Sequence, residues 1–261
     1  MRRTLTVLAT MLAVMAANPQ HAGADAMTGG VKVVSGGAFK QVLSALGALY
    51  REETGAALDI SYRTVGQNLA LIRAGTEAFD IAVLTPDAID SLVKEGRIVA
   101  GTRVALARTG IGVVVKTGTP LPDIGTVETF KSALLAARSV AYFDPKAGGS
   151  SGLYVAKLLV RLGIADAVNA KAVLVHGGAV ADHVANGEAE LGIHQISEIL
   201  PVAGTTLVGP LPAEIQHYTV YAAGLGTSAR DMTAARAVIQ FLAGPHALAV
   251  IRAKGMEPAQ P

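Results

Sequence analysis

Short apolar runs rich in Val, Ile and Leu alternate along this chain with stretches whose apolar residues recur at helical spacing. In the first cycle, residues 31–34 have a strand pattern and residues 39–50 a helical one. Further strand patterns follow at 58–62, 81–84, 139–143, 172–175 and 191–194. Such alternation is typical of α/β proteins, in which helices cover the faces of a sheet. We therefore expect an α/β fold.

The alternation breaks between residues 104 and 116. Two strand patterns, 104–107 and 111–116, follow each other there with no helix between them, and an extended run at 217–223 returns late in the chain. Extended segments absorb changes in φ and ψ and can act as hinges. We expect two lobes, each a mixed sheet flanked by helices, joined by these strand-like hinges; one continuous doubly wound sheet is the alternative. The expected boundaries give a first lobe of 27–108 plus 224–261 and a second lobe of 109–223.

The N-terminal segment has the pattern of an export signal. Met1-Arg2-Arg3 is basic, Leu5–Ala17 is apolar, and small residues at 22, 24 and 26 suit cleavage. The apolar run is shorter than the ~20 residues that a membrane-spanning helix needs. We expect a signal peptide at 1–26, a periplasmic location and, since no second long apolar run follows, a soluble mature protein.

The composition excludes several kinds of site. The chain has no cysteine, which excludes disulfides, zinc–thiolate sites and thiol nucleophiles. Its histidines show no H-E-x-x-H spacing, so no metal is expected. With 22 basic and 20 acidic residues, no nucleic-acid surface is implied. We expect a monomer without a metal or another cofactor.

Small polar residues gather in four turns, each between an expected strand and an expected helix. These turns contain Ser35-Gly36-Gly37, Thr64-Val65-Gly66-Gln67, Gly148-Gly149-Ser150-Ser151-Gly152 and His176-Gly177-Gly178-Ala179. Helix N-termini at the carboxyl ends of strands present free N–H groups to anions, and Gly and Ser allow close approach and add donors. Any one turn is also explained by ordinary turn chemistry. Four in matched positions favour a small anionic ligand held between the lobes.

The string Gly148–Gly152 formally fits the G-x-S-x-G pattern of serine hydrolases. A nucleophile elbow needs a strand that runs directly into the first glycine. Residues 144–147 stand between the expected strand and that glycine. We therefore expect no nucleophilic serine and no other catalytic residue in the binding interpretation.

Several segments together resemble the molybdate-binding proteins of ABC importers, within the type II periplasmic binding fold. The resemblance spans nearly the whole chain after the signal. It rests on the Ser35 turn and the segments 69–83, 90–96, 139–145, 153–157, 162–163, 190–193 and 241–245. It implies a substrate-binding protein that closes on an oxyanion and delivers it to an ABC transporter permease.

The resemblance also implies a set of ligand-binding residues. Ser35 and Thr64 match the family's hydroxyl positions, Ser151 and Gly177 match two backbone-amide positions, and Gln195 stands where the family has a tyrosine. The full set that we expect at the site is Ser35, Gly36, Arg63, Thr64, Gly66, Ser150, Ser151, His176, Gly177, Gly178 and Gln195.

The ligand and the activity stay open at this point. Neutral hydroxyls and amides suit molybdate or another oxyanion, whereas Arg63, His176 and His194 would suit a carboxylate. Isomerases of small tricarboxylates, of the aconitate isomerase type, also look like molybdate-binding proteins. Such an enzyme would need a base near an acidic C–H, for which His176, His194 or an Asp is available. Anion capture without turnover is the main interpretation and isomerisation the alternative.

Overall fold

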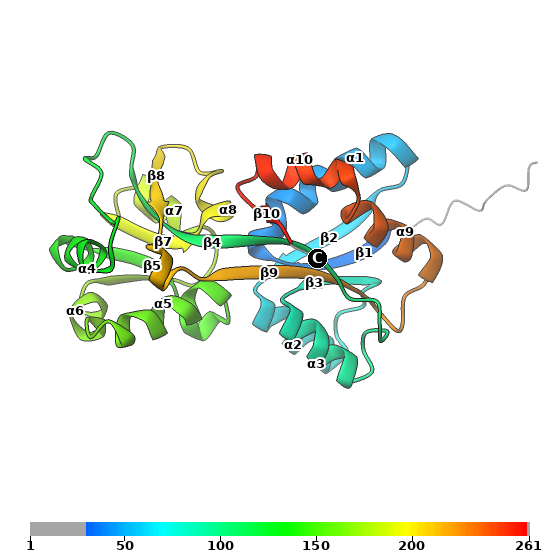
Figure 1. The fold of residues 1–261 in the computed structure, drawn as a ribbon. Coiled ribbons are helices and arrows are strands. Elements are labelled where there is room, and N and C mark those ends of the chain that lie inside the picture. Colours follow the sequence, from blue (N-terminus) through cyan, green and yellow to red (C-terminus); the bar gives the residue numbers. More distant parts are fainter. Residues whose placement is uncertain (1–29, 260–261) are drawn as a thin grey trace, which may run out of the picture.

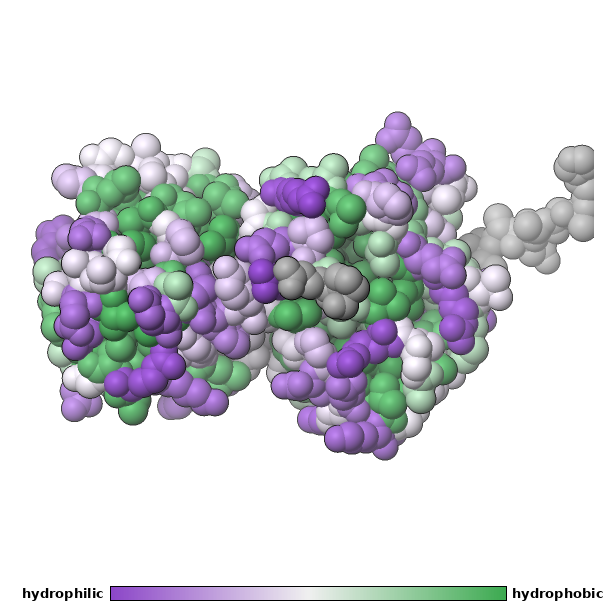
Figure 2. Space-filling view, in the orientation of Figure 1, coloured by the Kyte–Doolittle hydropathy of each residue, from purple (hydrophilic) through white to green (hydrophobic). Residues whose placement is uncertain are grey.

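The protein, seen in a computed structural model that describes residues 30–259, consists of two α/β lobes. Two long strands, β4 (Val104–Lys116) and β9 (Tyr218–Leu225), cross from one lobe to the other (Figure 1). In the space-filling view the two bodies meet at a narrow waist (Figure 2). The fold class expected from the sequence is thus confirmed. The expected signal peptide at 1–26 lies outside the described residues.

The first lobe is built mainly from the N-terminal third of the chain and its C-terminal end. Its elements are β1 (Val31–Gly36), the 3-10 helix η1 (Gly37–Phe39), α1 (Lys40–Thr54), β2 (Leu58–Arg63), α2 (Val65–Ala74), β3 (Ile81–Leu84), α3 (Pro86–Lys94), α9 (Met232–Leu242), α10 (Pro245–Ala253) and β10 (Glu257–Pro258). Helix α1 shows how the sequence pattern determines an element of this lobe. It buries Val42, Leu43, Leu46 and Tyr50 on one face and ends at Gly55, whose φ of 75° favours glycine.

The second lobe is built from the middle of the chain. Its elements are α4 (Val127–Ala136), β5 (Val140–Phe143), η2 (Pro145–Ala147), α5 (Ser150–Arg161), α6 (Ala165–Asn169), β6 (Ala172–Val175), α7 (Val180–Ala185), β7 (Leu191–Gln195), α8 (Ile196–Ile199), β8 (Thr205–Pro210) and η3 (Ala213–Ile215). Thr126 caps α4, because its hydroxyl accepts from the Thr129 N–H at 3.1 Å.

The strand order is β2-β1-β3-β9-β4-β7-β5-β6, with β8 and β10 also paired to β4. Strands β1, β2 and β3 are parallel, as are β5, β6 and β7, whereas β4 and β9 run antiparallel to their neighbours. Residues 104–110 of β4 pair with β9 in the first lobe, and residues 111–115 pair with β7 in the second. The lobe boundaries that we propose, near 108/109 and 223/224, fall within these two crossing strands.

Each lobe has its own apolar core. Phe39, Leu43 and Leu242 are buried in the first, and Phe130 and Ile193 in the second. Within residues 30–259, no single helix has the length and apolar character of a membrane span; α9 and α10 meet that test only together, across a bend of 58°. The inner faces of both helices pack into the first core.

Some local expectations were wrong. Residues 108–110 do not separate two strands, because pairing with residues 218–220 of β9 keeps them extended within β4. Helix α5 begins at Ser150 rather than 153, and α2 at Val65 rather than 68. Capping explains α2: Thr64 and Gln67 form a capping box, which starts the helix directly after the threonine.

Candidate functional site

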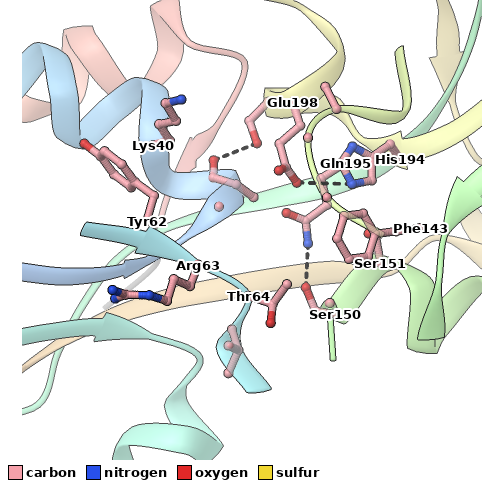
Figure 3. A pocket seen from close by; sticks show the side chains of 18 of the residues that line it. Lys40, Tyr62, Arg63, Thr64, Phe143, Ser150, Ser151, His194, Gln195 and Glu198 are labelled. Atoms are coloured by element: carbon pink, nitrogen blue, oxygen red, sulfur yellow. Dashed lines mark hydrogen bonds and ion pairs between the residues drawn. The ribbon is translucent and has the colours of Figure 1, made fainter. Parts of the chain in front are cut away.

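A cavity of about 450 Å³ lies between the lobes, at the carboxyl ends of β1, β2, β5, β6 and β7. Its walls come from η1 and the start of α2 in the first lobe, and from α5, the turn after β6 and α8 in the second (Figure 3). Ligands in open α/β sheets bind outside the carboxyl ends of strands. The cavity is therefore the candidate functional site.

The first turn of α5 forms one wall, and its glycines are packing residues. A Cβ on Gly149 would lie 2.7 Å from the Phe143 ring, and a Cβ on Gly152 would lie 2.2 Å from the Phe143 carbonyl oxygen. Gly148 has a φ of 73°. Three glycines thus let the N-terminus of α5 turn tightly against β5. The G-x-S-x-G string serves this close approach, which brings Ser150 and Ser151 to the cavity.

A hydrogen-bonded group of polar side chains lies beside Ser150. The Gln195 Nε2 donates to the Ser150 Oγ at 2.7 Å and to the Thr219 Oγ1 at 3.0 Å. The Tyr221 hydroxyl donates to the Gln195 Oε1 at 3.5 Å. Burial is the main cause that raises the pKa of Tyr221, so its hydroxyl keeps its proton. Thr219 and Tyr221 belong to the crossing strand β9, which links this group to the region between the lobes.

An imidazole and a carboxyl face each other next to Gln195, on the same side of the cavity (Figure 3). The His194 Nε2 lies 3.4 Å from the Glu198 Oε2, and the two side chains are 2% and 23% exposed. The His194 ring stacks on Phe143, with centroids 5.8 Å apart. Burial lowers the pKa of His194 to about 3 and raises the pKa of Glu198 to about 8. Near neutral pH the imidazole is uncharged and the carboxyl is largely protonated.

Contacts between the lobes close the cavity on two sides. The Ser197 Oγ donates to the Ala38 carbonyl at 2.9 Å, which holds α8 against η1. A Cβ on Gly37 would lie 3.1 Å from the Glu198 Oε1, so the same contact covers that carboxyl. On the other side, the Thr64 Oγ1 donates to the Ala147 carbonyl at 2.9 Å. These contacts hold the two lobes together on two sides of a cavity that stays open to solvent at its rim.

Basic side chains lie at its rim. Lys40, the first residue of α1, is exposed, and its ammonium lies 5.7 Å from the centroid of the Tyr62 ring. The Arg63 guanidinium is turned away from Ser150 and pairs with Glu77 at 3.2 Å (Figure 3). The His176 Nδ1 lies 3.0 Å from an Asp144 carboxylate oxygen. Of these three side chains, only that of Lys40 forms no ion pair with a carboxylate among residues 30–259.

The structure gathers most of the sequence-predicted site residues. Those that line the cavity are Arg63, Thr64, Ser150, Ser151, His176, Gly177, Gly178 and Gln195. Three others lie just outside the lining. Ser35 is fully buried, with its hydroxyl on the Gly36 carbonyl at 3.2 Å, and Gly66 packs on Gly148. The Thr64 hydroxyl hydrogen is used on the Ala147 carbonyl, whereas Ser150 and Ser151 of the second lobe line the cavity.

The sequence did not indicate Glu198, Tyr221 or Lys40. Glu198 stands four residues after His194, but a strand ends and a helix begins between them, so neither strand nor helix periodicity relates them. Tyr221 reaches the cavity from β9, about seventy residues along the chain from Ser150, through tertiary packing. Among the described residues, no group of three His, Asp or Glu side chains is arranged to hold a metal ion.

A family model for bacterial extracellular solute-binding proteins matches residues 31–257. The chain belongs to this family. A curated relative, the molybdate-binding protein ModA of Azotobacter vinelandii, is 27% identical over 86% of this chain and 88% of its own length. The solved structure of the periplasmic molybdate-binding protein of A. vinelandii has a TM-score of 0.74 and 24% identity, over 88% of this chain and 99% of that one. The resemblance to molybdate-binding proteins is thus confirmed.

A second curated relative is an enzyme. The aconitate isomerase of a Pseudomonas species is 33% identical to this chain over 98% of both proteins.

Proposed function

We propose that this member of the solute-binding family is a periplasmic isomerase of a small unsaturated tricarboxylate, with aconitate as the reference substrate. The observation that carries the proposal is the Glu198–His194 pair, a carboxyl and a buried imidazole that are largely shielded from solvent at the wall of a cavity between the lobes. The 33% identity to an aconitate isomerase over nearly the full chain supports it.

The size and charge of the cavity favour a polycarboxylate over a tetrahedral oxyanion. A volume of about 450 Å³ is roughly fifteen times the ~30 Å³ share of one water molecule. A tetrahedral oxyanion takes the space of only a few waters. A tricarboxylate would reach from the N-terminus of α5, where Ser150 and Ser151 donate, toward Lys40 at the rim.

The proposed reaction is an allylic proton shift. The Glu198 carboxylate removes a proton from the methylene carbon, and the C–H electron pair becomes the new C=C bond. The electron pair of the old C=C bond then takes a proton from Glu198 at its far carbon. The two oxygens of one carboxylate are spaced much like the two ends of a three-carbon allyl unit, so one residue serves both steps. No redox partner is needed.

Burial suits Glu198 to this task. A base is most effective when its pKa lies near the working pH, and the Glu198 pKa of about 8 is much closer to neutral than that of an exposed carboxyl. Negative charge that develops on the substrate is stabilised by the N–H groups that start α5, at the wall of the cavity. His194, which stays neutral, positions the Glu198 carboxyl.

The test uses the mature chain and trans-aconitate, with formation of the cis isomer followed by proton NMR. The wild type is expected to interconvert the isomers. Glu198→Gln should lower turnover by about 10²- to 10⁴-fold, the usual contribution of a general base, and should bind aconitate within a few-fold of the wild type. Glu188→Gln, which changes an exposed glutamate beside another histidine, is the matched control and should turn over normally.

Two results would reject the proposal in distinct ways. Tight aconitate binding without turnover by the wild type would leave capture for a permease as the function. Turnover that survives Glu198→Gln would keep the isomerase and remove Glu198 as its base.

A further inference from the structure

The protein leaves only the hydrogen of the Ser150 hydroxyl available for a ligand. A serine hydroxyl can accept two hydrogen bonds and donate one. The Gln195 Nε2 donates to its Oγ at 2.7 Å, and the Thr219 hydroxyl donates to it at 3.5 Å. Both acceptor positions are filled from the protein. The remaining hydrogen can only be donated, to the neighbouring Tyr221 hydroxyl or to an anion in the cavity.

The Gln195 side chain has three hydrogen-bond partners in the protein. Its side chain is 1% exposed, and its Nε2 uses both hydrogens, on Ser150 and on Thr219. Its Oε1 accepts from the Tyr221 hydroxyl. Tyr221 is kept protonated by burial, so it remains a donor to that oxygen. In this orientation both amide hydrogens and the amide oxygen have hydrogen-bond partners in the protein.

We propose that Gln195 is a positioning residue that forces Ser150 to act as a hydrogen-bond donor to a carboxylate, and that Thr219 and Tyr221 of the crossing strand fix Gln195 in turn. This inference goes beyond the proposed function, because it concerns which anions the cavity accepts and not the proton shift. A donor-only Ser150 selects ionised carboxylates and discriminates against protonated or neutral ligands, which need an acceptor at this position.

The arrangement also explains how a buried glutamine can lie beside an anion site. Both Gln195 N–H groups are satisfied inside the protein, so the residue acts on the ligand through Ser150. A direct contact would require one of these hydrogen bonds to break. Action through Ser150 and direct contact with the ligand predict different effects on binding when Gln195 and Ser150 are substituted together.

The test is a double-mutant cycle read by calorimetry with trans-aconitate, citrate and sulfate as separate probes. Gln195→Met should weaken aconitate binding by about tenfold, since one charge-assisted hydrogen bond loses its orientation. Ser150→Ala should weaken it by a similar factor. In the Ser150→Ala background, Gln195→Met should change affinity by less than about twofold, because the two residues act as a unit. Effects that multiply in the double variant would overturn the proposal and indicate direct contact.

Steady-state kinetics provide a second test of the role proposed for Gln195. Because Gln195 is placed to orient a binding donor, Gln195→Met should raise KM and leave kcat within about twofold, whereas loss of kcat alone would contradict the proposal. Thr219→Val, which removes one donor to Ser150 and keeps the side-chain shape, should produce a smaller rise in KM of the same kind.

A ligand-free measurement separates this inference from the proposed function. In the wild type, the Gln195 side-chain amide protons should exchange slowly in NMR spectra, and they should exchange faster in Ser150→Ala and in Thr219→Val. Fast exchange in the wild type would overturn the inference even if aconitate binds. Slow exchange together with a failure of every probe to bind would reject the proposed function and leave the orientation of Ser150 established.

Discussion

The second lobe contains two histidine–glutamate pairs among its described residues, and their surroundings differ sharply. The His183 Nδ1 lies 2.7 Å from the Glu188 Oε2, with side chains 30% and 54% exposed. The His194 Nε2 lies 3.4 Å from the Glu198 Oε2, with side chains 2% and 23% exposed. The surface pair has the shorter contact. The buried pair lines the cavity, stacks on Phe143 and leaves the His194 Nδ1 without a hydrogen-bond partner among residues 30–259.

Burial, rather than closeness of the partners, makes such a pair suited to proton transfer. In solvent, water stabilises both charged forms, and an exposed ion pair contributes little. In the cavity, desolvation disfavours both charges, so His194 stays neutral and Glu198 holds its proton to higher pH. Matched substitutions in the two pairs should therefore have different effects.

The two pairs should differ most in how the free energy of unfolding depends on pH. The folded-state pKa of Glu198, about 8, lies above the ~4.3 of an unfolded chain, so its contribution is fully present below about pH 4.3 and is lost as pH rises through 8. Glu198→Gln removes this loss. Between pH 5 and pH 8, its stability relative to wild type should rise by roughly 3 kcal/mol in urea unfolding. Glu188→Gln should show no such rise, and equal curves for the two variants would contradict the burial argument.

The second largest difference should be in turnover, between variants of His194 and of His183. His194→Asn removes the ring that positions Glu198 and should lower kcat for aconitate by about 30-fold, since small misplacement of a catalytic group is costly. His183→Asn should stay within about twofold of the wild type. Isomer formation followed by NMR measures both. Equal losses at the two sites would mean that His194 acts through general stability alone.

The lysines near the two pairs give the smallest expected difference. Lys40→Met removes the cation at the cavity rim and should raise KM for aconitate by about fivefold at low salt, with a smaller change at high salt because the charge is exposed. Lys116, whose ammonium lies 4.0 Å from where a Gly187 Cβ would stand near the surface pair, is the matched control. Lys116→Met should leave KM unchanged. A salt-independent effect at Lys40 would indicate a packing role.

The sequence predicted the parts of this account that depend on local pattern. The α/β alternation, the crossing near Gly110 and the turns with Ser150, Ser151 and Gly177 follow from periodicity and from the chemistry of helix N-termini. Eight of the eleven predicted site residues line the cavity. The turn that contains Ser35 lies beside it, and local pattern alone does not show which way the serine points.

Glu198 and Tyr221 could not be predicted in the same way, because their roles depend on burial between lobes. In the sequence, Glu198 looks like an ordinary acidic residue of a short helix. Only the folded structure shows that η1 of the other lobe lies over its carboxyl. Tyr221 reads as one of several apolar residues in an extended run. For Gln195 the sequence indicated the position, whereas its partners Ser150 and Thr219 emerged only from the folded structure.

The most direct test of the central claim is the pH dependence of kcat/KM for trans-aconitate, measured from pH 5.5 to 9.5 with the wild type. Because the Glu198 carboxylate is the active form and its pKa in the free protein is about 8, kcat/KM should rise tenfold per pH unit and level off above about pH 8. His194, neutral throughout this range, should add no step near pH 6.5. A profile that is flat from pH 5.5 upward, or a single rise near pH 6.5, would contradict the account of Glu198 as the buried base.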